Sequence, residues 1–234
     1  MDIKFLGTGG AFDYEYGNSS AYLRFRGKRI LLDCGHAVYP RLRAYGLADE
    51  IDYILLTHLH DDHVGSLATT ILHHIYVRQA ATKAKIIYPS EAMKQEIHDF
   101  LSFGFRRVSE KVDFVSIDEI PGLRAVESTG KHVPDMLSFS YIFEDDEMQV
   151  GYSGDLGEPD HLFPHLDSAS EKRVIVFHEI GFERMDGVHT YYKDLEPYLN
   201  QYEIYGYHTH PDRVAADNRI PLVMDHPEFL WPAS

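Results

Sequence analysis

The stretch Thr57-His58-Leu59-His60-Asp61-Asp62-His63-Val64-Gly65-Ser66 decides which fold and which chemistry we expect of this chain. It follows the apolar residues 53–56, which have the length and composition of a buried strand. The apolar positions after Ser66 predict a helix that is capped by this serine and extends to about residue 80. The histidines and aspartates therefore lie on a loop at the carboxyl end of a strand, where open α/β sheets place their ligands.

The spacing of these side chains favours a metal site. His58 and His60 are two residues apart, so both imidazoles can reach one point, and Asp62 and His63 can turn toward a second point. Imidazole and carboxylate are ligands that Zn²⁺ accepts, and two ions about 3.5–4 Å apart form a common clamp for hydrolysing phosphate esters. The alternative, a polar surface loop with accidental histidines, fits poorly with this pattern behind a buried strand.

The pattern H-x-H-x-D-H after a strand that ends in Thr resembles the signature of the metallo-β-lactamase fold superfamily. His58, His60, Asp62 and His63 occupy its positions. The resemblance implies an α/β fold, namely a four-layer αβ/βα sandwich, as a single hydrolase domain over residues 1–234. A chain of this length can form one such domain.

Later residues supply the other ligands that the resemblance implies. His132 follows the strand expected over 123–127, Asp155 follows the strand over 148–152 in the string Ser-Gly-Asp, and His208 follows the last expected strand. Asp155 would bridge two divalent ions, Zn²⁺ with Mn²⁺ as an alternative, and His210 is the alternative to His208. The full implied ligand set is His58, His60, Asp62, His63, His132, Asp155 and His208.

Candidates for catalysis are Glu179, His189 and Asp62. The string His178-Glu179-Ile180-Gly181-Phe182, with His189-Thr190 after it, resembles ribonuclease Z and its phosphodiesterase relatives. The resemblance implies that Glu179 and His189 handle protons or the phosphate, since an imidazole oriented by a carboxylate can protonate a leaving alkoxide. A hydrogen-bonded structural role is the alternative for both residues.

Three other segments bear on the site. Asp33, in Leu-Leu-Asp-Cys-Gly, is implied by the resemblance to support the metal loop, because ligand histidines need an outer hydrogen-bond partner. Tyr14 or Tyr16 could stack on a planar ligand, although exposed tyrosines without such a role are an equally good interpretation. The proline-containing residues 218–234 are expected to lie against the surface.

Composition limits the partners. The formal net charge is −15 with neutral histidines, so the surface repels long nucleic acids and a small substrate is expected. No apolar run approaches the roughly 18 residues of a membrane span, and the N-terminus lacks the pattern of a signal peptide. We therefore expect no membrane partner and a cytoplasmic location, and the resemblance implies a homodimer.

The function that these features favour is a binuclear-metal phosphodiesterase that hydrolyses small, cyclic nucleotides by a metal-activated hydroxide. Only a short hairpin is expected between His132 and Asp155, which leaves no room for the long basic arm that many ribonuclease Z proteins use to hold tRNA. Compact relatives without that arm include anti-Pycsar proteins, which cleave cyclic mononucleotides. The alternatives are a ribonuclease Z-like tRNA 3′-end processing enzyme, a lactone or other non-phosphorus ester hydrolase of the same fold, and a non-catalytic metal-binding module.

Overall fold

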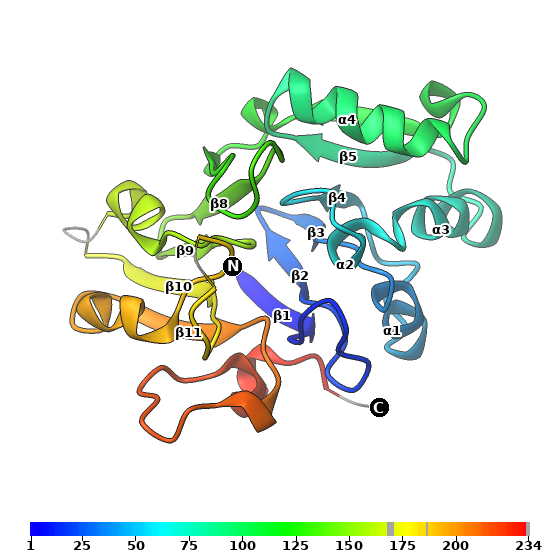
Figure 1. Cartoon of the computed structure of the whole chain (residues 1–234). Coiled ribbons are helices and arrows are strands. Elements are labelled where there is room, and N and C mark those ends of the chain that lie inside the picture. The colour runs from blue at the N-terminus through cyan, green and yellow to red at the C-terminus, as the bar shows by residue number, and fades with distance from the viewer. Residues whose placement is uncertain (168–170, 186, 233–234) are drawn as a thin grey trace.

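The strands form two sheets that pack against each other (Figure 1). The computed structural model describes residues 1–167, 171–185 and 187–232. The first sheet has the order β1 (Asp2–Gly7), β2 (Ser20–Phe25), β3 (Lys28–Leu32), β4 (Tyr53–Leu55), β5 (Ala84–Tyr88) and β6 (Val112–Ser116). The second has the order β11 (Glu203–Tyr207), β10 (Arg173–Glu179), β9 (Met148–Tyr152), β8 (Phe139–Glu144) and β7 (Leu123–Glu127).

Both sheets begin with antiparallel strand pairs and continue with parallel strand pairs. In the first, β1, β2 and β3 pair antiparallel and the strands from β3 to β6 pair parallel. In the second, β7, β8 and β9 pair antiparallel and the strands from β9 to β11 pair parallel. Consecutive strands β6 and β7 therefore belong to different sheets, although only a short 3₁₀ helix and a turn separate them.

The apolar run before the metal stretch forms the centre of the first sheet. Ile54 of β4 lies between Leu31 of β3 and Ile86 of β5 in parallel register, and all three are buried. Parallel strands are covered on both faces, which is why their residues are apolar without alternation.

Helices α1 (Val38–Ala44), α3 (Leu67–Leu72) and α4 (Glu91–Ser102) flank the first sheet (Figure 1). The helix α4 begins at Ser90, whose hydroxyl accepts a hydrogen bond from the Met93 amide at 3.2 Å. Such a cap satisfies one of the free amides at a helix start. The core-facing residues of α4 recur at helical spacing and are Met93, Ile97 and Leu101.

The helix after the metal stretch differs from the prediction. It is α-helical only to Leu72, and residues His73–Val77 form a π-helical turn. The Ser66 hydroxyl makes no cap hydrogen bond and instead donates to the carbonyl of His36 at 3.0 Å. The metal stretch is also not wholly a loop, because Asp61–Val64 form the short helix α2.

Short 3₁₀ helices connect the remaining segments. One of them, Tyr192–Tyr198, contains Pro197. The others are Val108–Glu110, Ile117–Glu119, Pro159–His161, Phe163–His165, Pro211–Arg213, Val223–Asp225 and Pro227–Phe229.

Aromatic side chains hold the sheets together. The ring centroid of Phe5 in β1 lies 5.1 Å from that of Phe177 in β10 and 5.5 Å from that of Tyr207 in β11. Tyr207 in turn stacks on Tyr152 of β9 at 5.1 Å. These side chains are fully buried, and with helices outside the sheets they complete the four-layer α/β sandwich that the sequence predicted.

The C-terminal segment is more buried than predicted. Leu222 and Phe229 belong to the core, and the amide of Trp231 donates to the carbonyl of Phe5 at 3.0 Å. The expectation that this segment only lies on the surface is therefore wrong, because its apolar residues between the prolines cover the edges of β1 and β11.

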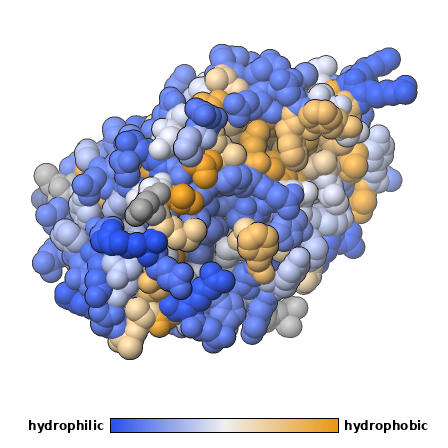
Figure 2. All heavy atoms as spheres, viewed as in Figure 1, coloured by the Kyte–Doolittle hydropathy of each residue, from blue (hydrophilic) through white to orange (hydrophobic). Residues whose placement is uncertain are grey.

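Most atoms on the face seen in Figure 2 are hydrophilic, and the hydrophobic ones gather in small patches. Within the described ranges, no helix combines the length and apolar character that crossing a bilayer requires.

Candidate metal centre

The carboxyl ends of strands from both sheets meet at one place. There β4 leads to His58, β9 leads to Asp155 and β11 leads to His208. Gly154 allows β9 to approach the metal loop, since its φ is +61° and an added Cβ would lie 2.9 Å from the Thr57 side chain. His208 also has a left-handed backbone, with φ of +66°, a strained conformation that is concentrated at functional sites.

The first cluster consists of three imidazoles. The Nδ1 atom of His60 lies 2.9 Å from Nε2 of His58 and 3.1 Å from Nε2 of His132. His58 and His132 are buried and His60 is partly exposed. The structure thus brings His132, a ligand that the sequence resemblance implied, to the point that His58 and His60 share.

The second cluster contains two imidazoles and two carboxylates. The Nε2 atom of His63 lies 3.4 Å from Oδ2 of Asp62 and 3.3 Å from Oδ1 of Asp155. The Nε2 atom of His208 lies 3.3 Å from Oδ2 of Asp62. All four groups point their potential ligand atoms at one another.

Asp155 lies between the two clusters. Its Oδ2 atom is 3.7 Å from Nε2 of His132 in the first cluster and 3.6 Å from Nε2 of His208 in the second. This is the placement that the sequence assigned to a bridging carboxylate.

Outer hydrogen bonds fix the orientation of the imidazoles. The Thr57 hydroxyl donates to Asp33 at 3.0 Å and accepts from Nδ1 of His58 at 3.0 Å. Asp33 also accepts from Nδ1 of His63, and the Val188 carbonyl accepts from Nδ1 of His132 at 2.7 Å. With the proton on Nδ1, each ring presents the lone pair of Nε2 to its cluster.

The residues fit divalent metal ions. Nε2 of His63 and Oδ1 of Asp155 are buried and form no hydrogen bond, which is costly for polar atoms unless another partner satisfies them. Nitrogen and carboxylate donors converging on two points suit Zn²⁺ and do not exclude Mn²⁺.

Burial and neighbouring charges set the protonation of the ligands. Burial, with the charge of His63, lowers the pKa of His58 well below its usual value. Burial also lowers the pKa of His63, but the carboxylates of Asp155 and Asp33 outweigh it and raise that pKa. Burial raises the pKa of Asp155, whereas the imidazoles of His208 and His63 hold it well below its usual range. A metal ion must therefore compete with a proton at His63.

Glu179 and His189 form a pair beside the clusters. Oε1 of Glu179 accepts from the amides of Thr190 at 2.9 Å and Leu156 at 3.2 Å, and Oε2 lies 3.3 Å from Nδ1 of His189. Burial lowers the pKa of His189, but the neighbouring carboxylate of Glu179 outweighs it and raises the pKa to about 9. The His189 ring lies 5.1 Å from the ring of His132.

His210 lies outside the clusters. Its Nδ1 accepts from the amide of Asp212 at 3.2 Å, and its ring meets that of Tyr16 edge-on at 5.2 Å. His208 is therefore the histidine that the structure places with Asp62. His178 is also remote from the clusters, with Nδ1 bonded to the Glu179 carbonyl at 2.8 Å and its ring stacked on Phe163.

A pocket of about 590 Å³ opens above the metal clusters, a size typical of small-molecule sites. No lysine or arginine is among its lining residues in the described part of the chain. Sequence reasoning missed Phe12 and Val133, since neither lies in a motif. The lining residues are Ala11, Phe12, Tyr14, His36, His60, Asp61, Asp62, His132, Val133, Asp155, Val188, His189 and His208.

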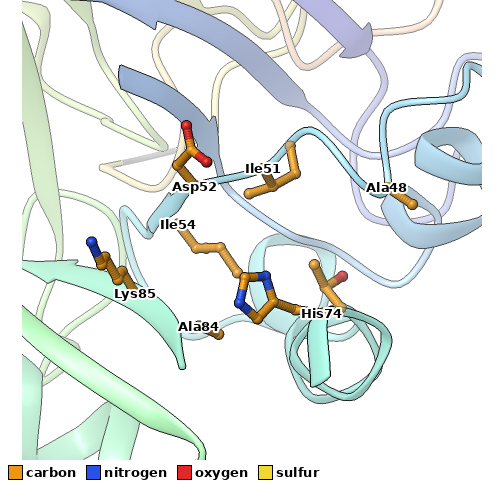
Figure 3. Close-up of a pocket in the computed structure, with 8 residues that line it drawn as sticks. Ala48, Ile51, Asp52, Ile54, His74, Ala84 and Lys85 are labelled. Carbon is orange, nitrogen blue, oxygen red and sulfur yellow. The ribbon is translucent and has the colours of Figure 1, made fainter. Parts of the chain in front are cut away.

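Another cavity lies beside β4, where Ile54, Ala84 and His74 line it (Figure 3). Its volume is about 10 Å³, which is room for about one water molecule. None of its lining residues belongs to the metal clusters, so it offers no competing substrate site.

Comparison with known proteins gives the family. The sequence model of the family described as "Anti-Pycsar protein Apyc1" matches residues 1–221. The chain belongs to this Apyc1 family. The anti-Pycsar protein Apyc1 of Bacillus phage 010DV004 is 29% identical over 224 residues, which cover 86% of this chain and 84% of the phage protein.

Solved structures share the fold of this Apyc1 family member. The metallo-β-lactamase fold protein YhfI of Bacillus subtilis matches with a TM-score of 0.69 and 18% identity, over 88% of this chain and 85% of that one. The short form of human tRNase Z matches with a TM-score of 0.60 and 18% identity, over 89% and 92%. Family, fold and His/Asp clusters together identify a metal-dependent hydrolase.

Proposed function

We propose that this Apyc1 family member is a binuclear-metal phosphodiesterase that hydrolyses small cyclic nucleotides. The observation that carries the proposal is the position of Asp155 between the cluster of His58, His60 and His132 and the cluster of Asp62, His63 and His208. The family also supports a cyclic nucleotide as the substrate, because the anti-Pycsar proteins that this sequence resembles cleave cyclic mononucleotides.

The protein supplies the geometry of the reaction. Bound divalent ions would acidify water at the site and neutralise charge on the phosphate. Glu179 is fixed by backbone amides, and we infer that it orients His189 as the acid. The attacking water gives up one proton to solvent as its oxygen bonds to phosphorus, the P–O ester bond breaks, and His189 gives its own proton to the leaving oxygen.

The pocket favours a small substrate with little charge. A phosphodiester carries one negative charge. The described pocket lining has no lysine or arginine that could neutralise further negative charge on a substrate. The net charge of −15 adds repulsion against tRNA, whose binding depends on many phosphate contacts. These features favour a cyclic mononucleotide over tRNA 3′-end processing.

The test is turnover by metal-loaded protein of cyclic CMP, cyclic UMP, cyclic AMP, an aryl phosphodiester and a lactone. We expect nucleoside monophosphates from the cyclic nucleotides. Turnover of the lactone without turnover of any phosphodiester would instead support a non-phosphorus ester hydrolase and refute the proposal.

The identity of the metal and the oligomeric state are also proposals. We propose zinc as the metal and a homodimer of a single-domain chain as the active form. The exposed Phe103, which is 94% accessible, and its neighbour Phe100 are candidate contacts. Sedimentation of the metal-loaded protein at twice the chain mass of 26.9 kDa would support the dimer, and sedimentation as a monomer would contradict it.

A further inference from the structure

Two aromatic side chains stand exposed at the rim of the metal pocket. Phe12 is 93% accessible and Tyr14 is 82% accessible, and both line the pocket. A single exposed aromatic residue needs no explanation. Two of them within three residues, both lining one pocket, place exposed aromatic surface beside a candidate ligand site.

The loop that carries them is anchored at its base. The Gly9 amide donates to the Gly17 carbonyl at 2.8 Å, and the Asn18 side-chain amide donates to the Gly10 carbonyl at 3.3 Å. The carboxylate of Asp13 accepts from the Tyr16 amide at 2.8 Å. These hydrogen bonds hold the backbone on both sides of Phe12 and Tyr14 beside the pocket.

The adjoining wall of the pocket offers another flat ring, that of His36. The His36 ring centroid lies 6.0 Å from that of Tyr14, and Nδ1 of His36 is bonded to Asp61 at 2.9 Å. Tyr16, the other tyrosine of the loop, packs on His210 instead and does not line the pocket. Planar surfaces thus lie above the clusters, where a base attached to a bound phosphodiester would project.

We propose that Phe12 and Tyr14 form a base-stacking subsite of the metal pocket. The nucleobase lies against these rings while its phosphodiester lies at the His/Asp clusters. This inference rests on the proposed function and names the part of the substrate that the rim recognises. Every base has a flat π face, so stacking selects for a base without strong preference among bases.

The experiment compares substrates with and without a base. The KM and kcat are measured for cyclic CMP, cyclic UMP, cyclic AMP and ribose 3′,5′-cyclic phosphate. Phe12→Leu and Tyr14→Leu should each raise the KM for the cyclic nucleotides about 5- to 50-fold and leave the KM for the baseless substrate unchanged. Tyr14→Phe, which keeps the ring, should restore the wild-type KM. Tyr76→Leu, at an exposed aromatic residue outside the pocket lining, is the matched control.

Equal effects on substrates with and without a base would overturn the inference, as would a Phe12→Leu/Tyr14→Leu double variant with wild-type KM values.

A binding measurement separates this inference from the proposed function. Calorimetry with metal-loaded protein should show tighter binding of cytidine 5′-monophosphate than of ribose 5-phosphate, and Tyr14→Leu should remove the difference. If that difference is seen without any phosphodiesterase activity, the subsite stands and the proposed function fails.

Discussion

Oδ2 of Asp33 lies 2.9 Å from Nδ1 of His63, and both side chains are fully buried. Asp33 adopts a left-handed backbone, with φ of +56°, and also accepts hydrogen bonds from Thr57. One carboxylate therefore positions both the start of the metal loop and a ligand of the second cluster.

Asp33→Asn should weaken metal binding at the second cluster. The amide keeps the shape of the side chain but loses the negative charge that holds the His63 proton on Nδ1. Loss of such an outer partner typically lowers metal affinity about 10- to 100-fold. Competition with a chromophoric chelator measures the change, and an affinity equal to that of the wild type would show that the hydrogen bond does not support the ligand.

Gly35→Ala should disturb the metal centre through a backbone clash. A Cβ at this position would lie 1.8 Å from the carbonyl oxygen of Asp62, so the ligand-bearing helix α2 must move. We expect a loss of about 1–3 kcal/mol in the free energy of unfolding and a lower metal content. Gly104→Ala is the control, since its nearest neighbour would be 3.9 Å away. Equal stability of the two variants would contradict the prediction.

His189→Gln should slow the reaction without removing metal. If His189 protonates the leaving group, kcat falls about 10²- to 10⁴-fold while elemental analysis finds the metal content of the wild type. Asp155→Ala should lose both activity and metal, because Asp155 lies between the clusters. Loss of metal in His189→Gln would instead make His189 a ligand, which its position near Asp155 and His132 allows.

The ion pair of Arg29 with Asp52 should make stability depend on pH. Nε and Nη2 of Arg29 each donate to Asp52 at 2.8 Å, and this hydrogen bonding lowers the pKa of the carboxyl group. A carboxyl group whose pKa is lower in the folded state contributes stability above its unfolded pKa of about 3.9, and the contribution disappears as the pH falls through the folded value.

Asp52→Asn should therefore lower the melting temperature at pH 7, and the difference from the wild type should shrink as the pH falls below about 4. The loss is expected to be below about 1 kcal/mol, because the pair is a third exposed and screened by water. Thermal melts of both proteins between pH 2 and pH 7 measure it. A difference that stays constant over this range would show that the charge of Asp52 contributes nothing.

Most of the site could be predicted because its residues follow strand ends. Strands are recognisable from apolar runs such as residues 53–56, and the structure confirms β4 there. Once the strands are placed, His58, Asp155 and His208 fall at their carboxyl ends, where chemistry converges in this fold. The sequence favours His208 by its place at the strand end and leaves His210 as an alternative, because it does not show the left-handed backbone with which His208 reaches Asp62.

Features that depend on packing were not predicted. Ser66 has the sequence position of a cap, yet its hydroxyl is used by the His36 carbonyl. Phe12 has no motif, and it lines the pocket only because its loop folds over the clusters. The prolines of the C-terminal segment predicted a position on the surface. Leu222 and Phe229 are instead buried, because this segment packs along the edges of both sheets.

The most direct measurement is the number of divalent ions bound per folded chain, determined by elemental analysis after loading and dialysis. We predict two ions per chain for the wild type and fewer for Asp155→Ala, with the fold of both proteins confirmed by circular dichroism. A wild-type protein that is fully folded and binds no divalent ion would contradict a metal centre built by the histidines and aspartates from His58 to His208.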